Sequence, residues 1–187
     1  MSRSFKRTAA AGFTLIELLI VVIILAIISA IAIPQFTAAT ADAQLAALDT
    51  SLANVRNSIE QYRVQHAGNL YPGATASTGG TACTGTQGTG AAGSAAAMTD
   101  QLRFASNAAG QTCSIAGGTF RFGPYLRQGL PAEPINNNDT VVITQTGAAI
   151  AAATGAAAVG WAYDTRSGQF IMNSNVADPN GRVYATH

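Results

Sequence analysis

The feature that most constrains this chain is an apolar run from Phe13 to Ile33, FTLIELLIVVIILAIISAIAI, in which Glu17 is the only charged residue. At about 1.5 Å per residue, a helix of this length can cross a hydrocarbon core of about 30 Å, so the run predicts a membrane helix. A carboxylate inside a membrane costs about 2.5 to 3.5 kcal/mol and marks a functional site with a positive partner. We therefore expect a function for Glu17. The alternative is a helix-end charge that reaches the lipid headgroups.

The residues before this run carry a one-sided charge. MSRSFKRTAAAG contains Arg3, Lys6 and Arg7 and no acid. Such a bias holds this end in the cytoplasm, so we expect the rest of the chain to face outward. A cleaved secretory signal is the alternative, since Ala30 to Ala32 offers a cleavage site. However, the apolar run exceeds the usual ~7 to 15 residues and continues as a helix, which favours a retained anchor.

The helical pattern resumes after Pro34, a residue that ordinarily ends or kinks a helix, so we expect a kink at Pro34 within one helix. Apolar side chains recur every three or four residues, which predicts an amphipathic helix to about His66, with Gly68 available as its cap. The stripe consists of Leu45, Leu48, Leu52, Val55, Ile59 and Tyr62. We expect it to pack on a globular domain. A free coiled coil is the alternative, but the stripe lacks sustained charged flanks.

The rest of the chain, 68–187, has the length of one small domain. Its segment 73–97 is rich in Thr, Gly and Ala, with almost no large apolar residue, which predicts a loop anchored from elsewhere. Cys83 and Cys113 are the only cysteines. In an exported domain such a pair favours a disulfide, and two free buried thiols are the alternative.

A short helix and several strands are expected in this domain. Met98, Leu102 and Ala105 fall on one helical face, with Ser94 or Thr99 as a possible cap. Short β-prone runs follow at 141–145, 160–163, 169–172 and 183–185, and a hairpin turn is expected over 164–168. We expect an antiparallel sheet laid across the stripe of the long helix, which is an α+β fold.

Composition argues against several classes of function. Of ten basic residues three precede Phe13, so seven are left beside the nine acids in the rest of the chain. This leaves no basic stripe, and nucleic acid is not expected as the main ligand. The acids are dispersed, and His66 and His187 lack ligand spacing, so neither a catalytic grouping nor a transition-metal site is indicated. We therefore do not expect an enzyme.

The hexapeptide from Gly12 to Glu17, GFTLIE, matches the prepilin motif, and on these residues the chain resembles the type IV pilin superfamily. The resemblance implies that a membrane prepilin peptidase cuts after Gly12 on the cytoplasmic side and methylates the new amine of Phe13. In a filament that amine can pair with Glu17 of a neighbouring subunit. Because an unpaired acid is costly in low dielectric, this pair would set the axial register.

Three further blocks look like the major pseudopilins of type II secretion systems: 122–126, 130–134 and 160–164. The resemblance implies a helical homopolymer whose partners are the prepilin peptidase, an inner-membrane assembly platform with its ATPase, and minor pilins or pseudopilins. It also implies a bacterial inner-membrane precursor with a periplasmic globular domain, and then a periplasmic or surface filament. The alternatives are a surface pilus for adhesion, motility or DNA uptake, and a secreted binding or enzymatic domain.

Calcium is a candidate ligand, because pseudopilins of this kind bind it and oxygen donors on adjacent loops suit it. The candidates are Asn138 and Asp139, within the run Asn136 to Asp139, together with Asp178. A plain Asn-rich turn is the alternative. The expected organisation is thus a basic leader at 1–12, a transmembrane and filament-core helix at 13–33, its amphipathic continuation at 34–67, and a globular domain at 68–187 with the insert 73–97.

Overall fold

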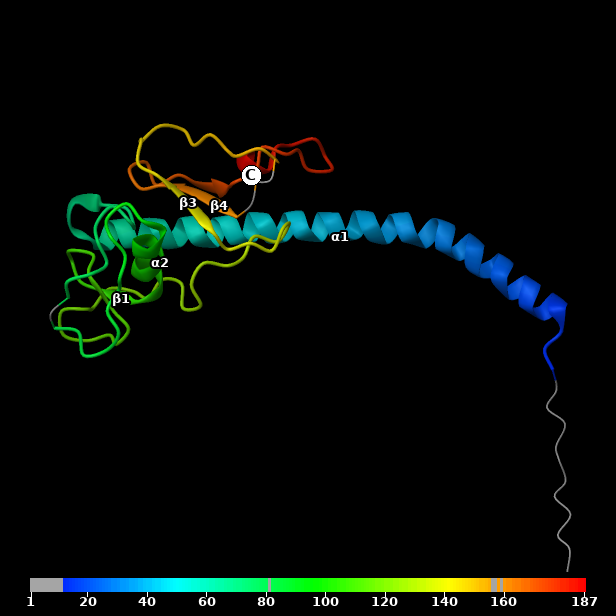
Figure 1. Ribbon diagram of the computed structural model, residues 1–187, viewed down its shortest axis with the longest axis horizontal. Helices are drawn as coiled ribbons and strands as arrows, with labels where there is room; N and C mark the ends of the chain where they lie inside the picture. Colours follow the sequence, from blue (N-terminus) through cyan, green and yellow to red (C-terminus); the bar gives the residue numbers. More distant parts are fainter. Residues whose placement is uncertain (1–11, 81, 156–157, 159) are drawn as a thin grey trace, which may run out of the picture. The chain divides into compact units, whose positions relative to one another are not determined.

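The computed structural model describes residues 12–80, 82–155, 158 and 160–187 (Figure 1). By internal contacts the chain forms two compact units that divide after Asp42. Helix α1, Leu15–Gln65, contributes to both and has Pro34 inside it. The leader expected at 1–12 lies outside the described residues except for Gly12. Helix α1 continues through Pro34 without interruption. The kink expected at this residue stays a prediction.

The second half of α1 supplies one side of the core of the unit 43–187. The predicted stripe is buried, and its residues pack with large side chains from the rest of the unit. The main members of this core outside α1 are Met98, Leu102, Trp161, Tyr163, Phe170 and Met172, each at most 1% exposed. The period of three and four therefore identified the buried face correctly, and the expected α+β architecture is confirmed.

A three-stranded sheet packs its side chains into this core. Its strands are β3, Val141–Thr144, β4, Trp161–Asp164, and β5, Phe170–Met172, in the order β3-β4-β5. Strands β4 and β5 are antiparallel, with Tyr163 opposite Phe170, as the hairpin prediction requires. All residues of β4 and β5 are buried.

The prediction of a wholly antiparallel sheet was wrong, because β3 runs parallel to β4, with Thr144 opposite Asp164. The segment 145–160 joins these strands, and it is long enough to return the chain to the starting edge of the sheet, as a parallel pair needs. The expected strand at 183–185 is also absent from the described structure: Val183 forms a single bridge with Ala177, and the 3-10 helix η3, Tyr184–Thr186, follows.

The short helix was predicted nearly correctly. It is α2, Ala95–Arg103, and the Ser94 hydroxyl caps it by accepting from the Ala97 N–H at 3.1 Å. Ala105 lies outside α2, in strand β1, Ala105–Ser106, which pairs antiparallel with β2, Thr112–Cys113. At the end of α1 the 3-10 helix η1, Ala67–Asn69, contains Gly68 at φ 75°, a left-handed conformation that favours glycine.

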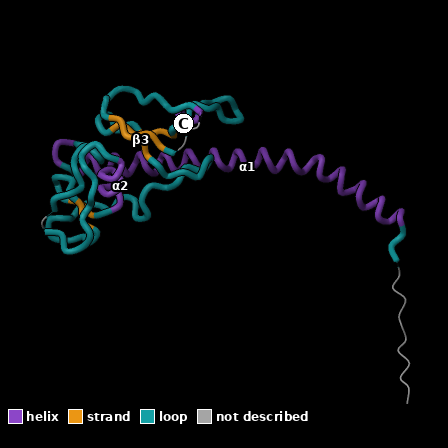
Figure 2. Tube along the Cα trace, viewed as in Figure 1, coloured by secondary structure: helices purple, strands orange, loops and turns teal. Residues whose placement is uncertain are grey.

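The Thr/Gly/Ala segment before α2 is irregular and is drawn as loop in Figure 2. Two neighbouring side chains of α2 anchor it. Asp100 Oδ2 accepts from the Ser77 hydroxyl at 2.7 Å and the Thr89 N–H at 2.9 Å. Gln101 Oε1 accepts from the Gly73 N–H at 2.6 Å, and its amide donates to the Thr75 carbonyl at 3.0 Å. The helix therefore orders a segment that has few large apolar side chains to bury.

The Cys83 and Cys113 sulfurs are bonded at 2.02 Å, which joins the same segment to β2. We predict that both cysteines are oxidised in the protein as it is isolated from its native source. Thiol labelling of the unfolded, unreduced chain is then expected to find no reactive thiol, and two thiols per chain would contradict the disulfide.

Removal of the bond in the double variant Cys83→Ser/Cys113→Ser is expected to lower the free energy of unfolding by about 3 to 4 kcal/mol on the chain-entropy model. Because Asp100 and Gln101 hold the segment independently, we expect it to remain docked on α2 without the bond. Hydrogen exchange of the Gly73 and Thr89 amides measures this docking, since both N–H groups donate to side chains of α2.

Candidate functional site

Thr14 and Glu17 form a reciprocal cap at the start of α1. The Thr14 N–H and hydroxyl donate to Glu17 Oε2 at 2.8 and 2.7 Å, and the Glu17 N–H donates to Thr14 Oγ1 at 3.3 Å. This is a capping box, which satisfies backbone donors that a helix start leaves free. Thr14 was not among the predicted site residues, although Thr-x-x-Glu spacing before an apolar run is the sequence signature of this cap.

Gly12 and Phe13 precede the helix in non-helical backbone. Both are exposed, and the Phe13 side chain is 89% exposed. A Cβ atom added at Gly12 would meet no atom of the described chain within 4 Å. Nothing in the described fold therefore requires glycine at this position, so a requirement for it would have to come from another protein that binds the peptide there.

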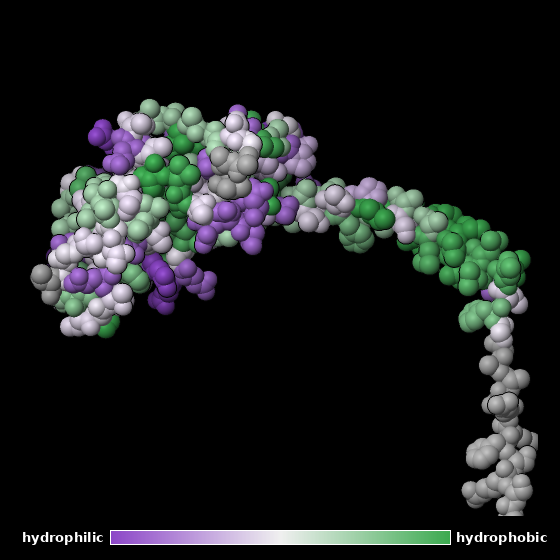
Figure 3. Space-filling model, viewed as in Figure 1, coloured by the Kyte–Doolittle hydropathy of each residue, from purple (hydrophilic) through white to green (hydrophobic). Residues whose placement is uncertain are grey.

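The first half of α1 is apolar around its whole circumference. Its most apolar 18-residue window has a mean hydropathy of 3.2 and no buried residue, so by length and composition the helix can cross a membrane. Figure 3 shows the most hydrophobic surface in view along this part of α1. A helix that is apolar on all sides needs lipid or several neighbouring apolar surfaces to cover it.

The three resembling blocks of the globular unit are connected through the core. The Trp161 indole N–H donates to the Pro131 carbonyl at 2.8 Å, which joins the second block to the third. The Tyr125 and Leu126 N–H groups both donate to the Leu102 carbonyl at 2.9 Å, which places the first block at the end of α2. These blocks position the sheet and α2 against each other.

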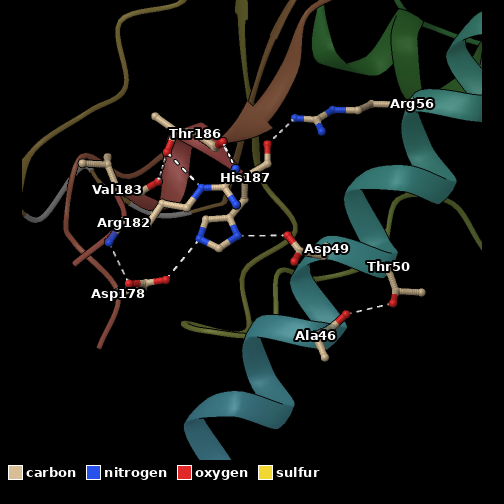
Figure 4. A network of polar contacts seen from close by, with 9 residues as sticks. All are labelled: Ala46, Asp49, Thr50, Arg56, Asp178, Arg182, Val183, Thr186 and His187. Atoms are coloured by element: carbon tan, nitrogen blue, oxygen red, sulfur yellow. Dashed lines mark hydrogen bonds and ion pairs between the residues drawn. The ribbon is translucent and has the colours of Figure 1, made fainter. Parts of the chain in front are cut away.

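Two of the three proposed calcium ligands, Asn138 and Asp178, use one oxygen within their own loops (Figure 4 for Asp178). Asn138 Oδ1 accepts from the Thr140 N–H at 2.8 Å, and Asp178 Oδ1 accepts from the Asn180 and Arg182 N–H groups at 2.8 and 2.9 Å. In the part of the chain that the structure describes, no three His, Cys, Asp or Glu side chains gather as a metal site would need. Calcium binding stays a prediction and gains no support from this geometry.

Asp164 is a buried acid whose role the sequence did not indicate. Oδ1 accepts from the N–H groups of Arg166 and Ser167 at 2.9 and 2.8 Å, and Oδ2 accepts from the Thr146 N–H at 2.8 Å. Burial alone would raise the pKa of this carboxyl. The N–H groups of Ser167, Arg166 and Gly147 and the Thr144 hydroxyl outweigh it and lower the pKa well below the usual range.

His66 is buried at the end of α1 in an aromatic environment. Its Nδ1 lies 2.7 Å from the Tyr62 carbonyl, which can only accept, so Nδ1 carries the proton, and Nε2 accepts from the Ser106 hydroxyl at 2.9 Å. The ring stacks on Tyr62 at a centroid distance of 3.7 Å. Burial lowers the pKa of His66 despite the backbone contacts with Tyr62 and Asn107. His66 is thus a neutral core residue.

Two comparisons with known proteins each match a part of the chain. Residues 7–33 match the family model described as the prokaryotic N-terminal methylation motif. A segment of 59 residues, 32% of this chain, is 46% identical to the type IV narrow pilus major component PilA5 of Thermus thermophilus. The chain spans about half the length of this relative, 51%. No solved structure matches the chain.

Proposed function

This chain belongs to the type IV pilin superfamily, and we propose that it is the shaft subunit of a helical filament, most specifically the major pseudopilin of a type II secretion system. The observation that carries the proposal is the first half of α1, which is apolar on every side and carries one acid at its start. Packed side by side, such helices cover one another, and a heterologous contact of this kind repeats without closing. The role is structural.

The proposed maturation begins at Gly12. A prepilin peptidase cuts after this exposed residue on the cytoplasmic side of the inner membrane and methylates the amine of Phe13. The mature subunit stays anchored by α1 with its globular unit in the periplasm, until the assembly platform and its ATPase transfer it to the filament. There the Phe13 ammonium pairs with Glu17 of a neighbour, which fixes the register of the packed helices.

Intact-mass measurement of protein purified from membranes tests the processing step. We expect loss of Met1 to Gly12 and one added methyl group on Phe13. Gly12→Ala should be processed far better than Gly12→Leu, because the protease must approach the backbone while the fold itself tolerates a side chain there. A full-length subunit that assembles normally would refute the proposal, and a new N-terminus at Ile33 would instead indicate a secreted domain released from its signal.

A surface pilus is the second candidate, and the similarity to a narrow pilus component favours it. The blocks 122–126, 130–134 and 160–164 favour the pseudopilus, since their order resembles that of major pseudopilins. Deletion of the gene that encodes this chain distinguishes the pseudopilus from the surface pilus. Loss of exoprotein secretion with unchanged surface filaments supports the pseudopilus, whereas loss of surface filaments with normal secretion supports the pilus.

A further inference from the structure

The loop before β3 contains the sequence Asn138-Asp139-Thr140, which is the only Asn-x-Thr or Asn-x-Ser triplet in the chain. Its middle residue is not proline. A triplet of this kind is the acceptor motif for N-linked glycans, which are attached to surface loops of exported proteins. In the structure Asp139 and Thr140 are exposed and Asn138 is half-buried, so the triplet lies at the surface as the motif requires.

Contacts within the loop fix the backbone around this triplet. The carboxylate of the buried residue Glu133 accepts from the Ile135 and Asn136 N–H groups at 2.7 and 2.8 Å. The Glu133 N–H in turn donates to the Asn138 carbonyl at 2.9 Å. The loop therefore presents Asn138 at a defined place on the globular unit.

The side-chain amide of Asn138 has its nitrogen directed away from the loop. The Thr140 N–H donates to Oδ1 at 2.8 Å, and because a backbone N–H can only donate, the atom that faces it is the amide oxygen. Among the described residues, the one buried side-chain nitrogen or oxygen without a partner is the Tyr163 hydroxyl. Asn138 Nδ2, which has no hydrogen bond with the described chain, is therefore open to solvent.

The Thr140 hydroxyl lies 2.6 Å from the same amide oxygen and donates to it. An amide nitrogen is a weak nucleophile, because its lone pair is delocalised into the carbonyl. A hydroxyl that donates to the oxygen draws electron density from the amide and makes its N–H more acidic. The chain thus already places the hydroxyl of the motif where it eases loss of the amide proton.

We propose that Asn138 is the acceptor of an N-linked glycan. Its Nδ2 attacks C1 of the first sugar of an oligosaccharide carried on a lipid diphosphate. The N–C1 bond forms as the bond from C1 to the diphosphate oxygen breaks, and the lipid diphosphate leaves with the electron pair. The amide proton passes to a base of the oligosaccharyltransferase that brings the two together.

The surface beside the acceptor has room for a sugar. An open groove of about 530 Å³ lies between α2, residues 128–130 and the chain that enters β3. Its polar lining side chains can bind sugar hydroxyls: Thr99, Arg103, Gln128, Asp139 and Thr140. A glycan attached at Asn138 therefore lies next to an open polar surface and displaces no side chain of the core.

This inference rests on the proposed function in one respect, since the globular unit must face the outer side of the membrane to meet the transferase. We suggest tryptic digestion of the protein purified from its native source, followed by mass spectrometry. Cleavage after arginine gives peptide 128–166, which contains Asn138, and peptide 13–56, which reports processing. The expected result is the added mass of one or more sugar residues on peptide 128–166 and one methyl group on peptide 13–56.

The two peptides keep the two proposals apart. An unmodified peptide 128–166 would overturn the glycan, and a methylated Phe13 in the same digest would leave the proposed function standing. A glycan on peptide 128–166 of a chain that retains residues 8–12 would instead support the modification and refute the processing.

Thr140→Val is the most informative variant, because it removes the hydroxyl and keeps both the acceptor amide and the N–H that orients it. We expect it to lose the sugar completely, as Asn138→Gln should. Thr140→Ser is the matched control and should keep the sugar, and Asn136→Gln should keep it too, since Asn136 is an exposed amide outside the triplet. Trp161 fluorescence checks that each variant is folded. A sugar that persists in Thr140→Val or in Asn138→Gln would overturn the assignment.

Discussion

Replacement of Glu17 by leucine is expected to abolish filament assembly while leaving membrane insertion, cleavage after Gly12 and the globular unit intact. Leucine is far less costly than an acid within a membrane, so insertion should improve. Assembly should fail because the ammonium group of each incoming subunit would lose its partner in a low-dielectric core. Breaking a buried pair in this way costs about 3 to 5 kcal/mol, which is more than about a hundredfold in association.

The capping box offers a competing explanation, in which Glu17 only stabilises the start of its own helix. Thr14→Val separates the two roles, since it removes the hydroxyl that contacts Glu17 Oε2 and keeps the carboxylate. Loss of a cap costs about 0.5 to 2 kcal/mol, which a long apolar helix can absorb. We therefore expect Thr14→Val to assemble and Glu17→Gln to fail.

Filament yield in sheared or cross-linked fractions measures both results, with intact mass confirming that each variant is processed. Wild-type yield from Glu17→Leu would refute the role of Glu17 in setting the register. Failure of Thr14→Val together with Glu17→Leu would mean that the cap itself is required.

The long helix could be predicted because its signal is local and repeated. The spacing of Leu48, Leu52, Val55 and Ile59 identifies a buried face without reference to the rest of the chain, and all four are at most 1% exposed. The Ser94 cap of α2 was likewise visible, since a capping residue acts within one turn of itself. Only the spacing of neighbours in sequence was needed in both cases.

The path of the chain around α2 and β3 could not be predicted, because it depends on pairs distant in sequence. Asp100 and Gln101 look like solvated polar residues of a short helix, yet they bind backbone groups of the insert that precedes it. Likewise, the sequence of the four residues of β3 does not indicate the direction of this strand relative to β4. Whether they run parallel or antiparallel to β4 depends on where the chain returns after β3. Asp164 contributes to this, since it binds Thr146 and Gly147 just after β3.

Replacement of Asp164 by alanine is expected to destabilise the globular unit by about 1.5 to 3 kcal/mol, because a buried carboxylate that accepts several hydrogen bonds is lost. The two carboxylate oxygens serve different segments. Oδ1 holds the turn between β4 and β5, and Oδ2 holds the chain just after β3 through Thr144 and Thr146. One side chain therefore holds the chain segments on both sides of the central strand, and its loss removes the acceptor that their N–H groups share.

Asparagine should not restore the stability, because its amide nitrogen replaces one carboxylate oxygen and cannot accept the hydrogen bonds made to that oxygen. Urea unfolding of the full chain in detergent, followed by the fluorescence of Trp161, measures the loss, with the exposed residue Asp139→Ala as the matched control. A change below about 1 kcal/mol in Asp164→Ala, within the range of ordinary surface substitutions, would contradict this role.

The pH dependence of the stability lost in Asp164→Ala gives an independent check on the role of this carboxylate. Because folding lowers the Asp164 pKa, its contribution is complete above the carboxyl's ordinary pKa of 3.8 and is lost as the pH falls through the folded value. The difference between wild type and Asp164→Ala should therefore stay constant from neutral pH down to about pH 5 and shrink only in stronger acid. A difference that disappeared between pH 7 and pH 5 would mean that the carboxylate is not held ionised by the donors around it.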